Sequence, residues 1–365
     1  GPGLALWRCM TQWLGGMGII VLFVAVLPTF GVTGYNLFRA EIPGGTIVER
    51  IKPRIAETAK SLWKVYLLLT VLAGLLLWAA GMPFYDAVCH SLTTLPTGCF
   101  SIKNQGIAAY NNLLIELIII LFMFIAGASF SLHYRLFHGE NSYSGNMEFK
   151  AYFLILFFFT ITVFAMLIIQ SSEDISIGNA LQQAIFQVVS IGTTTGFATT
   201  DYNHWPVVSQ LMLVILMFIG GCTGSTGGSI KVLRLVVSLK AAIRELSLVA
   251  NPRQVLTIKA GDKKISSEMA VNISSFIVLF IVIFILGAIC LTMTGMDMVS
   301  ALAGAAAAIG NVGPGLGEVG PASTYASLTP FAKWVLVILM LLGRLELYTV
   351  LALLLPWLQS TKISR

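Results

Sequence analysis

Three loops that are rich in oxygen donors and end in glycine recur in this sequence, each directly after a short apolar segment. The segments are DAVCHSLTTLPTG at 86–98, AIFQVVSIGTTTG at 184–196 and ALAGAAAAIGNVG at 301–313. Backbone carbonyl and hydroxyl oxygens held at a fixed radius can replace the hydration shell of a cation. A glycine at the end of such a loop adopts a positive φ without steric cost. The three loops therefore predict the selectivity filter of an ion-conducting pore.

The second of these loops carries the clearest pattern, because three consecutive threonines precede its glycine. A single TTTG motif is weak evidence, whereas three aligned loops between apolar helices are strong evidence for a pore. The predicted filter positions are Pro96, Thr97, Gly98, Thr194, Thr195, Gly196, Asn311, Val312 and Gly313. In this alignment Gly98, Gly196 and Gly313 are equivalent positions.

A glycine-rich stretch, GGCTGSTGGS at 220–229, interrupts the apolar helix expected after the second loop. Its glycines are expected to break that helix at mid-membrane depth, and such interruptions mark binding or gating elements where they face a cavity. We predict a gating loop beneath the filter, with a simple packing kink as the alternative. The predicted gating residues are Gly220, Gly221, Gly224, Ser225, Thr226, Gly227 and Gly228.

Two charged residues, Arg344 and Glu346, fall within the last apolar segment. Charges inside a membrane are costly and normally face the bundle interior or water. Because the two residues are two positions apart on a helix, they point to different faces and are not expected to pair. We predict that Arg344 is buried and either repels cations or anchors carbonyl groups of the glycine stretch. An interhelical ion pair is the alternative.

The composition places these loops in a membrane protein. The chain has 365 residues, of which 57% are hydrophobic and 10% are charged, outside the range of soluble domains. Apolar runs predict about seven spanning helices, each near the ~20 residues that cross a bilayer. The runs are 17–30, 67–82, 113–130, 151–169, 207–219, 273–293 and 331–355. We therefore predict an all-α polytopic membrane protein with repeated helix–pore loop–helix units.

Positive charges gather on alternate connections between the apolar runs. Of the 22 Lys and Arg residues, 18 lie in segments 39–64, 135–150, 231–264 and 362–365. The positive-inside rule places these connections in the cytoplasm. This placement explains the net charge of +6 without nucleic acid. On the opposite side carboxylates outnumber the single Lys103, which either concentrates cations there or reflects loops that are poor in Lys and Arg.

Residue types that commonly build catalytic or metal sites are scattered. Neither the five cysteines nor the four histidines show a ligand spacing. The sequence lacks a phosphate-binding glycine motif and a mid-membrane acid–base pair. We therefore predict that the chain is not an enzyme and holds no organic cofactor. A polytopic membrane enzyme and a non-conducting sensor remain the alternative classes.

The loops also predict an internal repeat. We expect the last helix of an earlier repeat at 1–38 and further repeats at 39–138, 139–250 and 251–365, each with one loop. Four units surround an ion more readily than three, so a fourth unit with its own filter loop is expected upstream of Gly1.

Several longer motifs resemble the TrkH family, the membrane subunits of bacterial Trk potassium uptake systems, which are related to the Ktr and plant HKT transporters. The motifs are WLGGMGII at 13–20, RAE at 39–41, PRIAETAK at 53–60, FIGGC at 218–222, GSTGG at 224–228, GPGLG at 313–317 and GRLE at 343–346. The resemblance covers essentially the whole chain. It implies a pseudo-fourfold, potassium-channel-like pore for K+ uptake across the bacterial cytoplasmic membrane.

The resemblance also implies roles for individual residues. Potassium would be coordinated at Thr97 and Gly98 beside Pro96, at Thr194 and Thr195, and at Asn311 and Val312. The stretch 220–229 would be the gating loop, and Arg344 the arginine that faces the pore.

Partners follow from the same resemblance. Family members form homodimers and bind a cytosolic nucleotide-binding regulatory ring, TrkA, which would dock on the side of segment 231–264. Selectivity is not predicted, because the family's first filter loop is not in this sequence. A sodium-preferring transporter or a cation-coupled symporter is therefore the alternative. Pro96 and Cys99 also replace the usual glycine-rich sequence, which predicts a distorted ion site in that loop.

Overall fold

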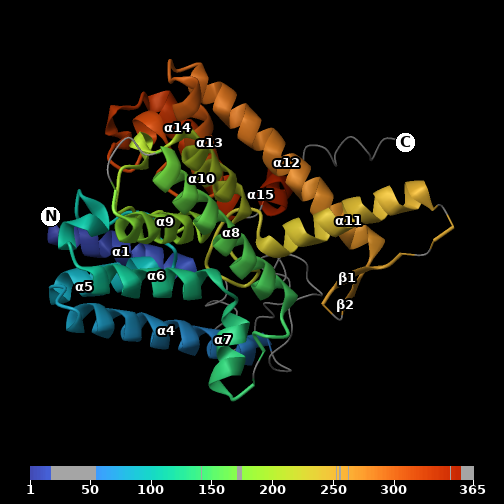
Figure 1. Ribbon diagram of the computed structural model, residues 1–365, viewed down its shortest axis with the longest axis horizontal. Coiled ribbons are helices and arrows are strands. Elements are labelled where there is room, and N and C mark those ends of the chain that lie inside the picture. The colour runs from blue at the N-terminus through green and yellow to red at the C-terminus, as the bar shows by residue number, and fades with distance from the viewer. Residues whose placement is uncertain are drawn as a thin grey trace.

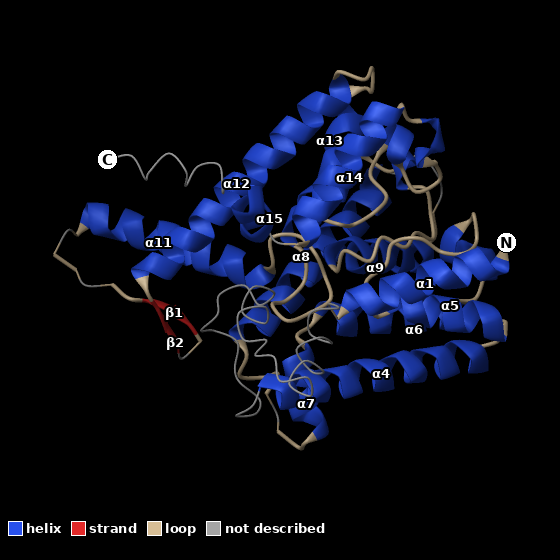
Figure 2. Cartoon of the chain, turned by 180° about the vertical axis from the view of Figure 1, so that it is seen from behind, coloured by secondary structure: helices blue, strands red, loops and turns tan. Residues whose placement is uncertain are grey.

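Helices form the architecture, as the apolar sequence predicts. A computed structural model of the chain describes residues 1–17, 55–140, 142–170, 175–251, 253–254, 256–261, 263–345 and 347–354. Within these residues the chain forms a helical bundle with one short two-stranded hairpin at its side (Figures 1 and 2). The predicted all-α class is therefore confirmed, apart from the hairpin.

Two groups of helices follow each other along the chain. The first comprises α1 (Pro2–Gly16), α4 (Ile55–Ala79), α5 (Phe84–Thr94), α6 (Leu113–Gly127), α7 (Phe130–Phe137), α8 (Met147–Gln170) and α9 (Ile177–Gly192). The second comprises α10 (Val207–Ile219), α11 (Val232–Ala250), α12 (Ser267–Thr292), α13 (Met298–Ile309), α14 (Pro330–Arg344) and α15 (Leu347–Leu354). Short 3-10 helices are η2 (Gly106–Tyr110), η3 (Tyr202–His204), η4 (Gly317–Val319) and η5 (Tyr325–Ser327).

The helices long enough to cross a membrane are fewer than the apolar runs. Among the described residues, α4, α8 and α12 each pass by length and composition, while α6 and α7 together form a pair bent by 102°. Run 331–355 is divided between α14 and α15, and run 207–219 forms the shorter helix α10. By length and composition, the prediction of one spanning helix for each run is therefore wrong for runs 331–355 and 207–219 within the described residues. Run 17–30 lies, beyond Met17, outside the described residues.

The bend between α6 and α7 lies against the glycine stretch 220–229, where the helical structure is interrupted a second time. The Cys222 amide donates to the Gly127 carbonyl (2.8 Å), and the Phe130 amide donates to the Gly224 carbonyl (3.0 Å). Backbone groups that leave a helix at membrane depth need such partners, because lipid supplies none. The bend and the glycine stretch 220–229 therefore satisfy each other's backbone.

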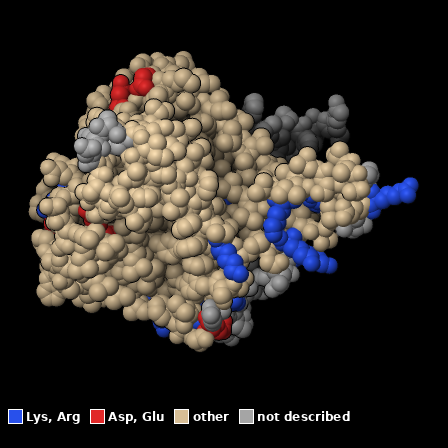
Figure 3. Space-filling model, viewed as in Figure 1, with Lys and Arg blue, Asp and Glu red and all other residues tan. Residues whose placement is uncertain are grey.

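The cationic connection 231–264 forms a projecting arm. Helix α11 extends away from the bundle, with the hairpin of β1 (Ile258–Ala260) and β2 (Lys263–Ile265) beside it (Figure 1). Figure 3 shows Lys and Arg side chains along this arm, while most of the visible acidic side chains lie on the opposite side of the molecule and another lies at its lower edge beside basic side chains. This separation agrees with the predicted cytoplasmic and outer sides.

Three short helices, α5, α9 and α13, lie inside the bundle. Each begins at a local start signal: Pro83 precedes α5, the Ser176 hydroxyl caps α9, and the Asp297 carboxylate accepts from the amides of Val299 (3.0 Å) and Ser300 (3.2 Å). Hydrogen bonds from Ser300 hold the pKa of Asp297 below its usual value. The alanines of α13 are buried, and their small side chains allow neighbouring backbones to approach closely.

Gly343 of α14 lies directly against the end of α13. This contact supplies a test of the packing between the two helices. A Cβ at this position would lie 1.9 Å from the Ile309 carbonyl oxygen and 2.7 Å from the Asn311 Nδ2. Gly343→Ala is expected to destabilise the protein by about 1–3 kcal/mol, because backbone cannot yield as a flexible side chain does. Thermal unfolding of the detergent-purified chain measures the effect.

Gly178→Ala is the matched control, because a Cβ there meets nothing within 4 Å in the same fold. The control should melt like the wild type. Equal melting temperatures for the two variants would contradict the close contact between α13 and α14.

Candidate functional site

The chain leaves α5, α9 and α13 in three loops that meet one another. We term residues 95–99, 193–197 and 310–314 the first, second and third loop. A Cβ at Gly196 would lie 1.9 Å from the Val312 carbonyl oxygen, and one at Gly313 would lie 2.3 Å from the Cys99 Cβ. Both glycines also have positive φ, 73° and 108°. The three loops therefore approach so closely that these positions have no room for a side chain.

The three loops share one backbone turn. In each, a residue other than glycine adopts the left-handed region, which such residues rarely do. The residues are Thr97 (φ 56°), Thr194 (φ 59°) and Asn311 (φ 55°). The amide of each donates to the carbonyl three residues earlier, and the next amide donates to the carbonyl five residues before it. The equivalent pairs are thus Thr97 and Gly98, Thr194 and Thr195, and Asn311 and Val312.

This turn corrects the alignment of the glycines. Sequence spacing pairs Gly98 with Gly196 and Gly313, whereas the hydrogen bonds pair Gly98 with Thr195 and Val312. Cys99 occupies the position of the two later glycines. The predicted equivalence of the three glycines is therefore wrong by one residue in the first loop. Hydrogen bonds to the preceding helix determine where the turn lies. The position of a glycine in the sequence does not reveal these bonds.

Hydroxyl groups hold the second loop from within. The Ser190 hydroxyl donates to the Phe197 carbonyl (2.6 Å), and the Thr193 hydroxyl donates to the Val189 carbonyl (2.7 Å). The hydroxyls of Thr193 and Thr195 lie 2.7 Å apart and hydrogen-bond to each other. All of these side chains except that of Val189 are at most 2% exposed. The loop therefore has a fixed shape that its own side chains maintain.

The glycine stretch 220–229 separates α10 from α11, so the predicted interruption of that helix is confirmed. It lies directly against all three loops. The Gly228 amide donates to the Thr194 hydroxyl (2.7 Å), and the Thr97 hydroxyl donates to the Thr226 carbonyl (3.1 Å). A Cβ at Gly228 would lie 2.5 Å from the carbonyl oxygen of Gly310. Any movement of the stretch must therefore break contacts with the loops.

The other predicted residues of the stretch shape its backbone. Gly220 and Gly224 have positive φ, 74° and 77°. The Gly221 carbonyl accepts from the Val232 amide (3.0 Å), and the Ser225 hydroxyl donates to the Cys222 carbonyl (2.6 Å). These bonds fold the stretch into a compact loop. The first loop is closed on its other side by α1, where a Cβ at Gly16 would lie 2.3 Å from the Pro96 Cβ.

Arg344 links the last helix to this stretch. Its Nη1 donates to the Thr226 carbonyl (2.9 Å), and its Nη2 donates to the carbonyls of Gly15 (2.9 Å) and Gly16 (3.1 Å) at the end of α1. The prediction that Arg344 is buried is wrong, because α14 ends at this residue and its side chain is exposed. Of the roles expected for it, the anchoring of loop carbonyls has direct contacts. Glu346 lies outside the described residues.

Two charged residues that the sequence did not single out hold the ends of the stretch. The Glu148 carboxylate accepts from the Thr223 amide (2.5 Å), and the Lys231 ammonium donates to the carbonyls of Gly227 (2.5 Å) and Ser225 (3.4 Å). Glu148 lies in the first turn of an apolar helix, and Lys231 belongs to the cationic connection. In the sequence, Glu148 looks like an acidic residue at a helix start and Lys231 like one charge of a cytoplasmic connection. Neither pattern predicts a contact with the glycine stretch.

Known proteins with similar sequences are cation transporters. The family model for TrkH, a cation transport protein, matches residues 3–365. The chain is 40% identical to the Trk system potassium uptake protein TrkH of Salmonella typhimurium, over 97% of this chain and 73% of that protein. The TrkH protein of Escherichia coli strain K12 is also 40% identical, with the same coverage.

A solved structure matches as well. The crystal structure of the potassium transporter TrkH from Vibrio parahaemolyticus superposes with a TM-score of 0.84 at 38% identity, covering 97% of this chain and 73% of that one. The relatives and the apolar helices place the chain in the bacterial inner membrane as a multi-pass protein. The chain belongs to the TrkH family of cation transport proteins.

Proposed function

We propose that the chain takes up potassium across the bacterial cytoplasmic membrane through a filter of backbone carbonyls, gated by the glycine stretch. The observation that carries this proposal is the shared left-handed turn of three loops that meet one another. The relatives' names support potassium as the ion, since they are Trk system potassium uptake proteins. Transport of this kind needs no enzyme chemistry and no organic cofactor.

The filter would use the three equivalent pairs of the shared turn. A left-handed residue followed by its neighbour turns successive peptide planes, which lets carbonyl oxygens line one path. The pairs are Thr97 and Gly98, Thr194 and Thr195, and Asn311 and Val312. Pro96, Gly196 and Gly313 would shape the path. Each pair belongs to one repeat, at 39–138, 139–250 and 251–365, and α1 would belong to the repeat before them.

The gate would act by occupying the space beneath these loops. Thr226 is its central residue, because its hydroxyl donates to the Leu95 carbonyl (2.8 Å) while its carbonyl accepts from Thr97 and Arg344. Opening would require these bonds to be exchanged for water. Arg344 would therefore hold the closed state as an anchor of the stretch.

Partner subunits complete the proposal. A Trk system is a set of components, and we infer a homodimer that binds a TrkA-like cytosolic nucleotide-binding subunit. The cationic arm formed by α11 and the hairpin lies on the expected cytoplasmic side, where such a subunit would dock (Figure 3). The link from this subunit to the gate is the direct connection of α11 to the stretch through Lys231.

The first test concerns the filter. Gly196→Ala is expected to abolish rubidium and potassium uptake into liposomes, because its Cβ would lie 1.9 Å from the Val312 oxygen at a positive φ. Gly178→Ala, on the same helix-and-loop segment, should retain uptake. Normal selective uptake by Gly196→Ala would contradict a filter at these loops. Wild-type uptake that prefers sodium, or that requires a second ion, would instead favour the alternative of a sodium-preferring or coupled transporter.

The second test concerns the gate. Arg344→Ala is expected to raise uptake without the regulatory subunit by roughly tenfold. The substitution removes charge-assisted bonds that hold the glycine stretch closed, and losing one such bond favours the open state by about this factor. Lys333→Ala is the control, since the Lys333 ammonium donates to the Ala326 carbonyl of a neighbouring turn (2.8 Å), away from the glycine stretch. Rubidium uptake into liposomes measures both variants.

Arg344→Lys separates two roles of the arginine. Lysine keeps the positive charge but not the forked donors that reach Thr226 and α1 together. An anchor predicts that Arg344→Lys resembles Arg344→Ala. Uptake at the wild-type level in Arg344→Lys would show that the charge alone matters, and unchanged uptake in Arg344→Ala would contradict both roles.

A further inference from the structure

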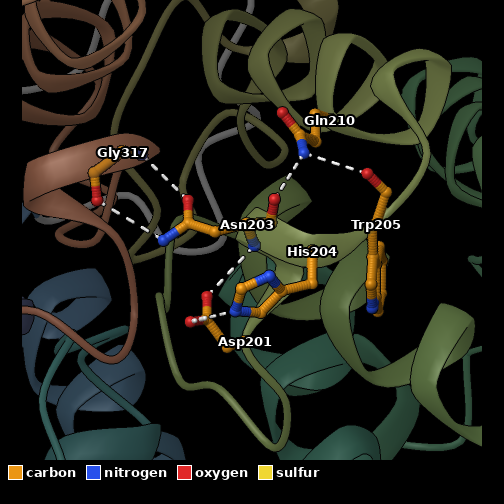
Figure 4. Close-up of polar contacts among 6 residues, drawn as sticks. All are labelled: Asp201, Asn203, His204, Trp205, Gln210 and Gly317. Carbon is orange, nitrogen blue, oxygen red and sulfur yellow. Dashed lines mark hydrogen bonds and ion pairs between the residues drawn. The ribbon is translucent and has the colours of Figure 1, made fainter.

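A side-chain amide joins the segments that follow the second and the third loop. Asn203 of η3 donates from Nδ2 to the Gly317 carbonyl (3.4 Å) and accepts at Oδ1 from the Gly317 amide (2.8 Å) (Figure 4). One side chain thus satisfies both backbone groups of a residue 114 positions away. Gly317 has a φ of 64°, and a Cβ there would lie 2.1 Å from the Ser300 hydroxyl. The contact is therefore specific to the observed register of the two segments.

Neighbouring groups hold the Asn203 side chain and backbone in place. The Asn203 backbone amide donates to the Asp201 carboxylate (3.0 Å), and Gln210 of α10 donates to the carbonyls of Asn203 (2.7 Å) and Trp205 (2.9 Å) (Figure 4). On the other side, a Cβ at Gly320 would lie 2.3 Å from the Asn203 Nδ2. Asn203 therefore transmits the fixed position of α10 to the segment beyond the third loop.

Two tyrosine hydroxyls hold the outer end of the third loop itself. Tyr325 of η5 donates to the Gly313 carbonyl (2.5 Å), and the buried Tyr202 donates to the Pro314 carbonyl (3.4 Å). These bonds fix two successive peptide planes. The Gly313 plane follows Val312, whose carbonyl oxygen lies against Gly196 of the second loop. A change at Tyr325 is thus one peptide away from the closest contact between the two loops.

We propose that Asn203 and Tyr325 are positioning residues for ion selectivity. They form an outer clasp, defined by the bonds of Asn203 to Gly317 and of Tyr325 to Gly313. The Asn203 bonds tie the segment after the second loop to the segment after the third, and the Tyr325 bond fixes the third loop to the latter segment, so that together they keep the third loop at its distance from the second. This inference rests on the proposed function and adds to it the residues that set the radius of the filter. Sodium is smaller than potassium, so a loop free to move inward gives up discrimination between the two ions.

The test measures selectivity and total transport separately. Tyr325→Phe removes one hydroxyl without changing the ring, and Asn203→Ala removes both bonds to Gly317. Each is expected to lower the ratio of rubidium to sodium uptake into liposomes by roughly three- to tenfold, the factor for one lost hydrogen bond. Rubidium uptake itself should stay near the wild-type rate. Asn203→Asp, which keeps the acceptor for the Gly317 amide, should restore part of the ratio.

Matched controls come from the same fold. His204→Ala changes the neighbouring side chain of the same turn, which is 84% exposed and lies 3.7 Å from the Asp201 carboxylate, and it leaves both bonds from Asn203 to Gly317 in place. Tyr348→Phe removes a tyrosine hydroxyl that donates to the Asn272 carbonyl. Both should keep the wild-type ratio.

The outcomes separate this inference from the proposed function. A potassium-selective wild type with an unchanged ratio in Tyr325→Phe and Asn203→Ala would overturn the clasp and leave the proposed function standing. Loss of rubidium and sodium uptake in equal proportion in Tyr325→Phe would also overturn it, because a merely structural role predicts that result. A wild type without preference for potassium or rubidium would overturn the proposed selectivity, and the clasp with it.

Discussion

Every peptide group that leaves a helix inside a bilayer must find its hydrogen-bond partner in protein or in a water-filled cavity, because hydrocarbon supplies none. In this chain the non-helical segments supply that partner to one another. The glycine stretch 220–229 bonds to the bend between α6 and α7, to the hydroxyl of Thr194 and, through Thr226, to the first loop. The three loops, the bend and the stretch are therefore one polar unit, and the apolar helices are arranged around it.

This mutual satisfaction limits how the unit can move. A bond such as that from the Thr97 hydroxyl to the Thr226 carbonyl is released only when water or another protein group replaces it. The gating proposed for the stretch thus implies a wet cavity beneath the loops in the open state. It also implies that the shape of the filter and the position of the gate depend on each other, because Thr97 and Thr194 take part in both.

The sequence predicts which elements make up this polar unit better than it predicts which of their residues contact one another. Apolar runs, alternating charge and glycine clusters predict the helical membrane fold, the three loops and the break at 220–229, since each depends on local composition. The position of Cys99 opposite Gly313 depends on hydrogen bonds to the end of α5. The bend at Gly127 depends on a segment far along the chain. Asn203 acts through a backbone group that no side-chain pattern marks. Such contacts are tertiary, and one sequence does not encode them in any local signal.

The two helices that flank the stretch differ in how far they extend beyond the core. Before it, α10 is packed into the core by Leu213, Leu216 and Met217. After it, Lys231 opens α11, whose buried residues end at Val237 and whose remainder projects from the bundle (Figure 1). A force applied to the projecting part of α11 reaches Lys231, which bonds to the carbonyls of Ser225 and Gly227. Val232, the first residue of α11, belongs to the same buried cluster as these residues of α10, so the core holds both ends of the stretch. Opening driven from α11 would therefore have to break the Lys231 bonds and shift the buried first turns of α11 as well.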